Sequence, residues 1–113
     1  MRIRNVLQEY EARLEPSPDS RCPTARGKAE WKVYGDGTRQ CKVSVSKLDL
    51  PDGVVLELVV DHRRITQLTV QRGTARYRRE TERGEGVPEV KLDQVLQVVH
   101  AGQVILEGRF YSE

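Results

Sequence analysis

Residues 27–46 alternate between apolar and polar side chains in two runs that are separated by a glycine-containing turn. Alternation with this period is the pattern of a β-strand that buries one face. Gly35-Asp36-Gly37-Thr38 lies between the runs and has the composition of a tight turn, since glycine adopts positive φ without strain. The stretch therefore predicts a β-hairpin, and any fold of this chain has to accommodate that hairpin.

Directly opposed residues of a hairpin share one face of the sheet, so burying both apolar sets fixes the register. The resulting loop has an odd number of residues, as in hairpins that are closed by a bulge. The pairs that this reasoning predicts are Val33 with Cys41, Trp31 with Val43, and Ala29 with Val45.

Most of the remaining chain also has the pattern of short strands. Residues 1–15 fit either a helix or a strand, and we predict a strand over 7–15 because the segments that follow are all β. The apolar run 54–60 is interrupted only by Glu57, so we expect it to lie deep in a sheet. Further strands are predicted over 65–70, 74–79, 95–99 and 104–110.

About eight short strands at near-regular spacing predict an all-β domain, a single antiparallel β-sandwich, with a small β-barrel as the alternative. At 113 residues the chain fits one domain, 1–113, in which residues 1–6 are a candidate disordered segment. The core residues that we expect are Trp31, Val43, Leu56, Leu58, Leu96, Val98, Leu106 and Phe110.

Two segments of the chain repeat each other. Residues 55–59 and 65–70 align without gaps on residues 95–99 and 105–110. We interpret them as two structurally equivalent hairpins, with turns at 61–64 and 100–103.

Bulk properties exclude little about partners. A net charge of +2, with 37% hydrophobic and 32% charged residues, fits a soluble domain and argues for no partner class by itself. No apolar run is long enough for a membrane helix, so no membrane association is expected. The first residues do not read as a signal peptide, which favours a cytoplasmic location, or an extracellular one if a leader precedes this sequence.

The chain has two cysteines, Cys22 and Cys41. They lack the spacing of metal ligands and are not cross-strand partners in the predicted hairpin, so a disulfide would require the loop around Cys22 to fold back over it. We expect both to be reduced, with Cys41 packed as a small apolar side chain.

The run from Tyr10 to Val60 resembles the opening of CHRD-type domains, the repeat named after chordin, and the end of the chain is similar to small bacterial β domains of the same plan. This resemblance implies an extracellular-type β-sandwich without enzymatic activity. CHRD domains carry a His-x-His element that this chain lacks, so no role of those histidines can be transferred. The elements that carry the resemblance are Leu14-Glu15-Pro16, Gly27-Lys28-Ala29, Trp31, Gly35-Asp36-Gly37, Leu48-Asp49-Leu50, and residues 86–88 and 104–110.

The two histidines, His62 and His100, occupy the turns of the two equivalent hairpins. If these turns lie at the same end of the sandwich, the imidazoles could share a metal ion with Asp61. Three ligands from exposed turns make a weak site, so we predict solvated turn histidines and no cofactor.

Arginines are concentrated between Asp61 and Glu85. In the strand around Tyr77, Arg76 and Arg78 would point to one face and contact phosphates, with Tyr77 or Tyr34 available to stack on bases. Against this, Tyr77 shares a face with Ala75 and is expected in the core, and nearby acids offset the positive field. The full set of candidate binding residues is Arg63, Arg64, Arg76, Arg78 and Arg79.

No local motif of a nucleophile, a metalloprotease or a phosphate-binding loop occurs in the sequence, so we expect no enzyme. The leading interpretation is a non-catalytic module that binds another protein or a matrix component, or that associates with itself through an edge strand. The alternative is nucleic-acid binding through the arginine-rich strand and loop 76–83.

Overall fold

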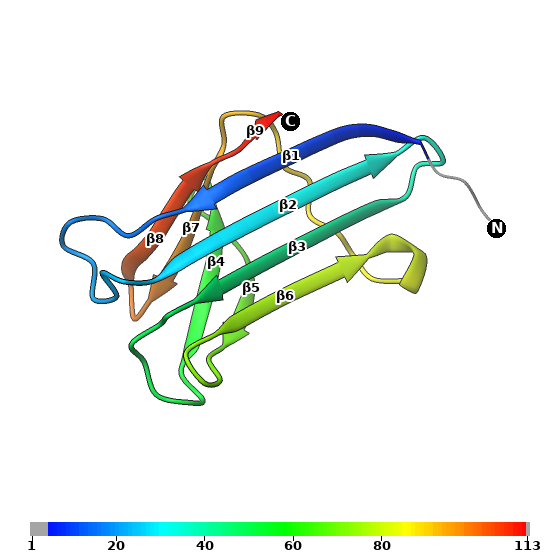
Figure 1. The fold of residues 1–113 in the computed structure, drawn as a ribbon. Coiled ribbons are helices and arrows are strands. Elements are labelled where there is room, and N and C mark those ends of the chain that lie inside the picture. The colour runs from blue at the N-terminus through cyan, green and yellow to red at the C-terminus, as the bar shows by residue number, and fades with distance from the viewer. Residues whose placement is uncertain (1–4, 113) are drawn as a thin grey trace.

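The computed structural model describes residues 5–112, and within this range the chain forms nine β-strands and one short 3₁₀ helix (Figure 1). The strand over 7–15 is confirmed, and its helical alternative is wrong. The candidate disordered segment 1–6 lies outside the described residues except for residues 5 and 6, the second of which starts the first strand. The elements are β1 (Val6–Leu14), β2 (Arg26–Tyr34), β3 (Arg39–Ser46), β4 (Val55–Val60), β5 (Arg63–Thr69), β6 (Ala75–Glu80), η1 (Thr81–Arg83), β7 (Val95–His100), β8 (Gln103–Arg109) and β9 (Tyr111–Ser112).

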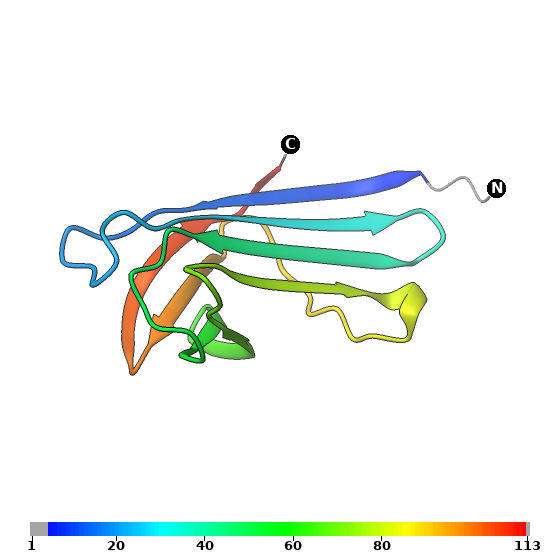
Figure 2. The same cartoon turned by 60° about the horizontal axis from the view of Figure 1, so that its bottom comes forward.

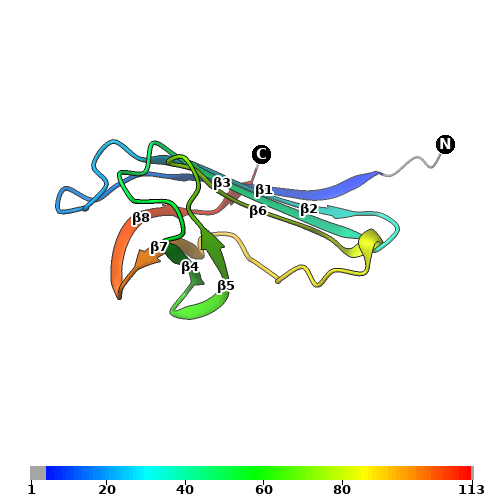
Figure 3. The same cartoon turned by 90° about the horizontal axis from the view of Figure 1, so that it is seen from below.

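The strands form two antiparallel sheets that pack as a sandwich, which confirms the predicted fold class. A five-stranded sheet has the order β6-β3-β2-β1-β9, and a four-stranded sheet has the order β5-β4-β7-β8. The sheets stay separate layers and do not close into a barrel (Figures 2 and 3). Sandwich packing is expected here because each sheet has one apolar face to bury.

The register of the opening hairpin differs from the prediction by two residues. The structure pairs Trp31 with Cys41 and Ala29 with Val43. The loop has an odd length as predicted, but it is centred on Asp36, whose carboxylate accepts a hydrogen bond from the backbone N–H of Thr38 at 3.0 Å. Gly37 then takes the left-handed position, φ 85°, that closes a three-residue loop with a bulge. A shift of two leaves every side chain on its predicted face.

The two equivalent hairpins are confirmed, since β4–β5 and β7–β8 lie side by side in the four-stranded sheet. Each has a bulge at the same place, after Leu58 in one and after Val98 in the other. Each turns through two residues of positive φ, Asp61-His62 and Ala101-Gly102, as two-residue hairpin loops require.

The prediction that the whole run 54–60 is deeply buried was wrong. Leu56 and Leu58 are fully buried, whereas the side chain of Val55 is 47% exposed. The four-stranded sheet is antiparallel and has only one face against the core, so successive residues of β4 alternate between core and solvent.

All eight predicted core residues are buried. Trp31 and Phe110 meet edge to face between the sheets, with ring centroids 5.2 Å apart. Tyr77 is also buried, as predicted.

The two sheets are joined along one side of the sandwich. β1 runs on past Leu14 so that Glu15 exchanges two backbone hydrogen bonds of 3.0 Å with Glu107 of β8. After β8, the chain passes through Phe110, and β9 pairs with β1 in the five-stranded sheet. The hydroxyl of Ser20 donates a hydrogen bond to the carbonyl of Ile105 at 2.7 Å, so the 15–25 loop also covers the edge of β8.

The five-stranded sheet extends beyond the four-stranded sheet at one end of the molecule. There the irregular segment 84–94, here called the strap, crosses beneath the inner face of the longer sheet (Figures 2 and 3). The indole N–H of Trp31 donates a hydrogen bond to the carbonyl of Pro88 at 2.9 Å and ties the strap to that face.

Candidate functional site

Four cationic side chains lie together on the outer face of the five-stranded sheet, which points away from the four-stranded sheet. Arg76 and Arg78 come from the edge strand β6, Lys42 from β3 and Lys28 from β2. The register places Arg78 opposite Lys42, and residues two apart on a strand share a face. We call Lys28, Lys42, Arg76 and Arg78 the basic quartet.

The basic quartet surrounds an open groove of about 450 Å³. Ser44 and Glu30 complete its polar lining. The groove lies on an exposed sheet face, so it suits contact with an extended surface or chain better than enclosure of a small molecule.

In the part of the chain that the structure describes, Lys28 is one of two members of the basic quartet that form ion pairs. Its ammonium Nζ lies 3.2 Å from a carboxylate oxygen of Glu11 and 3.2 Å from one of Glu30. The hydrogen bonds to Glu11 and then to Glu30 raise the pKa of Lys28 above its ordinary value, so it stays charged at neutral pH. The carboxylate of Glu11 is almost fully buried beneath it, which fixes this charge in place.

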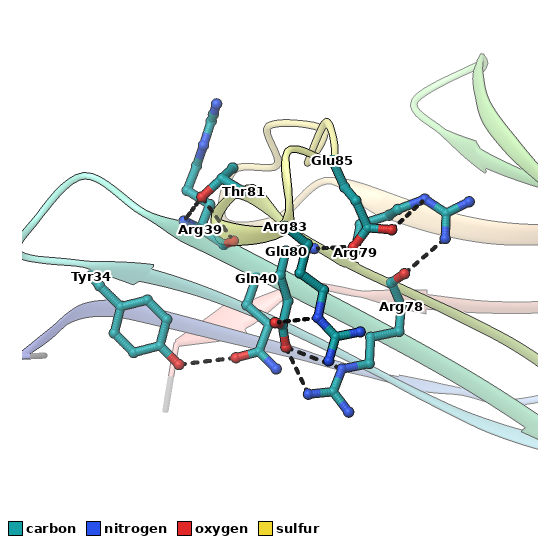
Figure 4. A network of polar contacts seen from close by, with 9 residues as sticks. All are labelled: Tyr34, Arg39, Gln40, Arg78, Arg79, Glu80, Thr81, Arg83 and Glu85. Atoms are coloured by element: carbon teal, nitrogen blue, oxygen red, sulfur yellow. Dashed lines mark hydrogen bonds and ion pairs between the residues drawn. The ribbon is translucent and has the colours of Figure 1, made fainter. Parts of the chain in front are cut away.

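Arg78 belongs to a polar network at the far end of the same face (Figure 4). Its Nη2 donates to Oε1 of Glu80 at 2.7 Å, and Nε of Arg83 lies 3.4 Å from the other oxygen of that carboxylate. Nearby, the hydroxyl of Tyr34 donates to the side chain of Gln40 at 3.0 Å. The network keeps Arg78 extended along the sheet face.

The other two members carry the uncompensated charge of the face. Among residues 5–112, Lys42 and Arg76 take part in no ion pair within 4.0 Å, and both are exposed. They lie on β3 and β6, where Glu80 is the acid of the same face, whereas Glu9 and Glu11 lie on β1 and Glu30 lies on β2, directly opposite Lys42. The positive charge is therefore concentrated in the half of the sheet next to the β6 edge.

The structure brings together only part of the predicted arginine set. Arg76 and Arg78 share a face as predicted. Arg79 points to the inner side, where its guanidinium carbon lies 4.6 Å from the centre of the Tyr77 ring. Arg63 and Arg64 start β5 in the other sheet, so they do not extend the same surface.

The predicted aromatic stacking platform is not formed. Tyr77 is buried between the sheets, and the phenol of Tyr34 is bonded to Gln40 and largely covered. Within the described chain, the basic quartet has no exposed aromatic ring beside it on which a base would stack.

The histidines cannot share a metal ion. β4 and β7 are antiparallel neighbours, so the turn containing His62 lies at one end of the sheet and the turn after His100 at the other. Asp61 uses its carboxylate to accept a hydrogen bond from the backbone N–H of Val95 at 3.0 Å. No cluster of three metal-ligating side chains occurs among residues 5–112.

Both cysteines are free thiols, and both are completely buried. Burial raises the pKa of Cys41 to about 11, only partly offset by the neighbouring Arg79. At neutral pH this thiol is protonated and inaccessible, so it cannot act as a nucleophile.

The chain matches no protein-family model, and no curated protein is significantly similar to it. No helix within residues 5–112 has the length and apolar character needed to cross a membrane.

Sequence reasoning missed Lys28 and Lys42 as partners of the two arginines. Both alternate with buried residues in the opening hairpin, so their outward direction could be predicted. Their proximity to Arg76 could not be predicted, because it depends on the pairing of β6 with β3, two strands that are separated in the chain by residues 47–74.

Proposed function

We propose that this β-sandwich is a non-catalytic binding module that uses the basic quartet to hold an acidic segment of another protein. The observation that carries the proposal is the concentration of unpaired positive charge, from Lys42 and Arg76, on a flat exposed sheet face. Complementary charge of this kind steers encounter and fixes the register of partners.

The mixed charge of the surrounding face favours a protein partner. Glu11, Glu30 and Glu80 each contact a member of the basic quartet. These carboxylates limit the positive surface to a few neighbouring side chains, which matches a short acidic segment of a protein better than a long, continuous phosphate backbone. The resemblance to CHRD-type domains stays a prediction, because no family model matches the chain.

Two further features support a non-catalytic role. Cys41 is buried and protonated, and the two histidines lie at opposite ends of their sheet, so within the described chain neither histidine is paired with the other or with an accessible thiol. Self-association through an edge strand stays a prediction, but β6 is a poor edge for it. The backbone N–H of Glu80 donates to the Glu85 carboxylate at 3.1 Å, and a guanidinium nitrogen of Arg79 donates to the carbonyl of Arg78 at 2.8 Å.

A second candidate function is contact with nucleic-acid phosphates, favoured by the adjacent exposed arginines Arg76 and Arg78. Without an aromatic platform this contact would be limited to the backbone, independent of sequence and steeply dependent on salt.

The experiment is a two-dimensional amide NMR titration with a short oligoglutamate peptide and, in parallel, a short DNA duplex. The test protein is the double variant Arg76→Gln/Arg78→Gln. The matched control is Arg63→Gln/Arg64→Gln, which removes the same charge from an exposed strand of the other sheet. We expect oligoglutamate to shift amides of β3 and β6 and to bind the test variant at least about tenfold more weakly, equivalent to about 1.4 kcal/mol.

Equal weakening by both double variants would show a non-specific charge effect and refute the proposal. Tighter binding of the duplex than of oligoglutamate at physiological salt, lost in Arg76→Gln/Arg78→Gln, would establish the nucleic-acid alternative instead.

A further inference from the structure

A second cavity lies on the opposite side of the five-stranded sheet from the basic quartet. It has a volume of about 370 Å³ and lies between the inner face of the sheet and the strap, open to solvent on one side. This volume falls in the lower part of the range of small-molecule sites in proteins. Its existence follows from the fold, because the longer sheet overhangs the shorter one and only the strap covers the overhang (Figures 2 and 3).

Apolar side chains line the cavity on both sides. Tyr10, Trp31 and Val33 line it from the sheet, and Pro88 and Val90 line it from the strap. Tyr10 and Val33 are only partly covered, so they present surface to an occupant, whereas Trp31 is 3% exposed and lies at the cavity wall. An accessible tyrosine ring next to aliphatic side chains suits a flat apolar or aromatic group.

The rim of the cavity carries an excess of positive charge. Arg39 and Lys91 lie there together with one acid, Glu89. Arg39 Nη1 lies 3.2 Å from Oε1 of Glu89, but the side chain of Glu89 is 80% exposed. An exposed ion pair of this kind contributes little, so an incoming anion can take over the guanidinium of Arg39.

We propose that this cavity binds a small molecule with a flat aromatic body and one carboxylate, the ring lying against Tyr10 and Val33 next to Trp31 and the carboxylate on Arg39. The site is independent of the basic quartet, which occupies the other face of the sheet.

The position of Trp31 makes the proposal directly measurable. It is the only tryptophan of the chain, it lines the cavity, and its indole N–H bonds to the strap at Pro88. Occupancy should therefore change both its fluorescence and its indole N–H signal.

The probes are 2-naphthoate and its uncharged analogue 2-naphthamide, titrated into the full chain and followed by Trp31 fluorescence and amide NMR. We expect saturable shifts at Trp31, Tyr10 and Val90, and tighter binding of naphthoate than of naphthamide. Arg39→Gln should weaken naphthoate by at least about fivefold and leave naphthamide unchanged, since only the carboxylate uses the guanidinium.

The control variant is Arg64→Gln, which removes an arginine from the other sheet and should leave both probes unaffected. Val33→Phe, which fills the cavity, should abolish binding of both. The absence of saturable shifts, equal affinity for the two probes, or naphthoate binding unchanged in Arg39→Gln would each overturn the proposal.

Discussion

Replacing Gly108 by alanine should be among the most damaging single changes in this domain. Gly108 lies in β8 where β1 crosses over it, next to the bridge between Glu15 and Glu107. A Cβ at position 108 would overlap the carbonyl oxygen of Arg13, and it would lie 2.8 Å from the carbonyl carbon. These are backbone atoms, so a side-chain rotation cannot relieve the overlap.

The expected cost follows from what has to move. Displacing the backbone at Arg13 lengthens the two 3.0 Å hydrogen bonds between Glu15 and Glu107, each worth about 1 kcal/mol. Overpacking against Leu14 adds about 1–3 kcal/mol. We therefore expect Gly108→Ala to lower the free energy of unfolding by about 3–5 kcal/mol, a large part of the stability of such a domain.

The assay is urea unfolding followed by the fluorescence of Trp31. Gly86→Ala is the matched control, because a Cβ there meets no atom within 4 Å, and it should change the unfolding free energy by less than about 1 kcal/mol. Gly27→Ala is an intermediate case, with Leu14 Cδ1 at 3.0 Å and the carbonyl oxygen of Ser44 at 3.2 Å. Its expected cost is about 1–2 kcal/mol. A stability of Gly108→Ala equal to that of Gly86→Ala would refute the close approach of β1 and β8.

Three further predictions concern the core and the strap. Because burial raises the pKa of Cys41 to about 11, only the unfolded chain is ionised at this thiol near pH 10, so stability falls as pH rises through this range. Cys41→Ala removes this pH dependence. The difference in unfolding free energy between wild type and variant should therefore narrow by about 2 kcal/mol between about pH 8 and pH 10.5. A difference that stays constant over this range would contradict the raised pKa of Cys41. Trp31→Phe removes the hydrogen bond to Pro88 and should cost about 2 kcal/mol in urea unfolding, followed by circular dichroism because the variant has no tryptophan. It should also speed hydrogen exchange in the strap, and unchanged exchange would show that the bond does not hold the strap in place. Glu85→Ala frees the backbone N–H of Glu80 at the β6 edge, so self-association measured by sedimentation should increase. Glu82→Ala is the control, and its self-association should equal that of the wild type.

The sequence predicted the features of this fold that depend on short-range patterns. Alternation identified the strands and their faces, and the glycine at position 37 identified the first turn. The repeated hairpins could be predicted because both copies keep the same spacing around the turn. The register of the first hairpin was missed because Asp36 and Gly37 together centre the loop on Asp36, one residue before the centre that the apolar pattern alone implies.

Features that depend on distant pairing could not be predicted. The placement of β6 beside β3 created the basic quartet, and nothing local to Arg76 signals it. The opposite ends occupied by His62 and His100 follow from the antiparallel pairing of β4 with β7. The cavity beneath the strap depends on the unequal lengths of the two sheets, which single strands do not reveal.

The joined side of the sandwich has a consequence for how the chain acquires its structure. Strand β1 pairs with β2 soon after both exist, but its other partners, β8 and β9, come last. The contact between Ser20 and Ile105 likewise joins residues that are 85 positions apart. Contacts of such sequence separation make folding slow, since a long loop must close before they form. Phe110, which packs against Trp31 of the first hairpin, follows β8 in the chain, so the apolar face of that hairpin is fully covered only after β8 is in place, and the partly covered face is a site where aggregation can start.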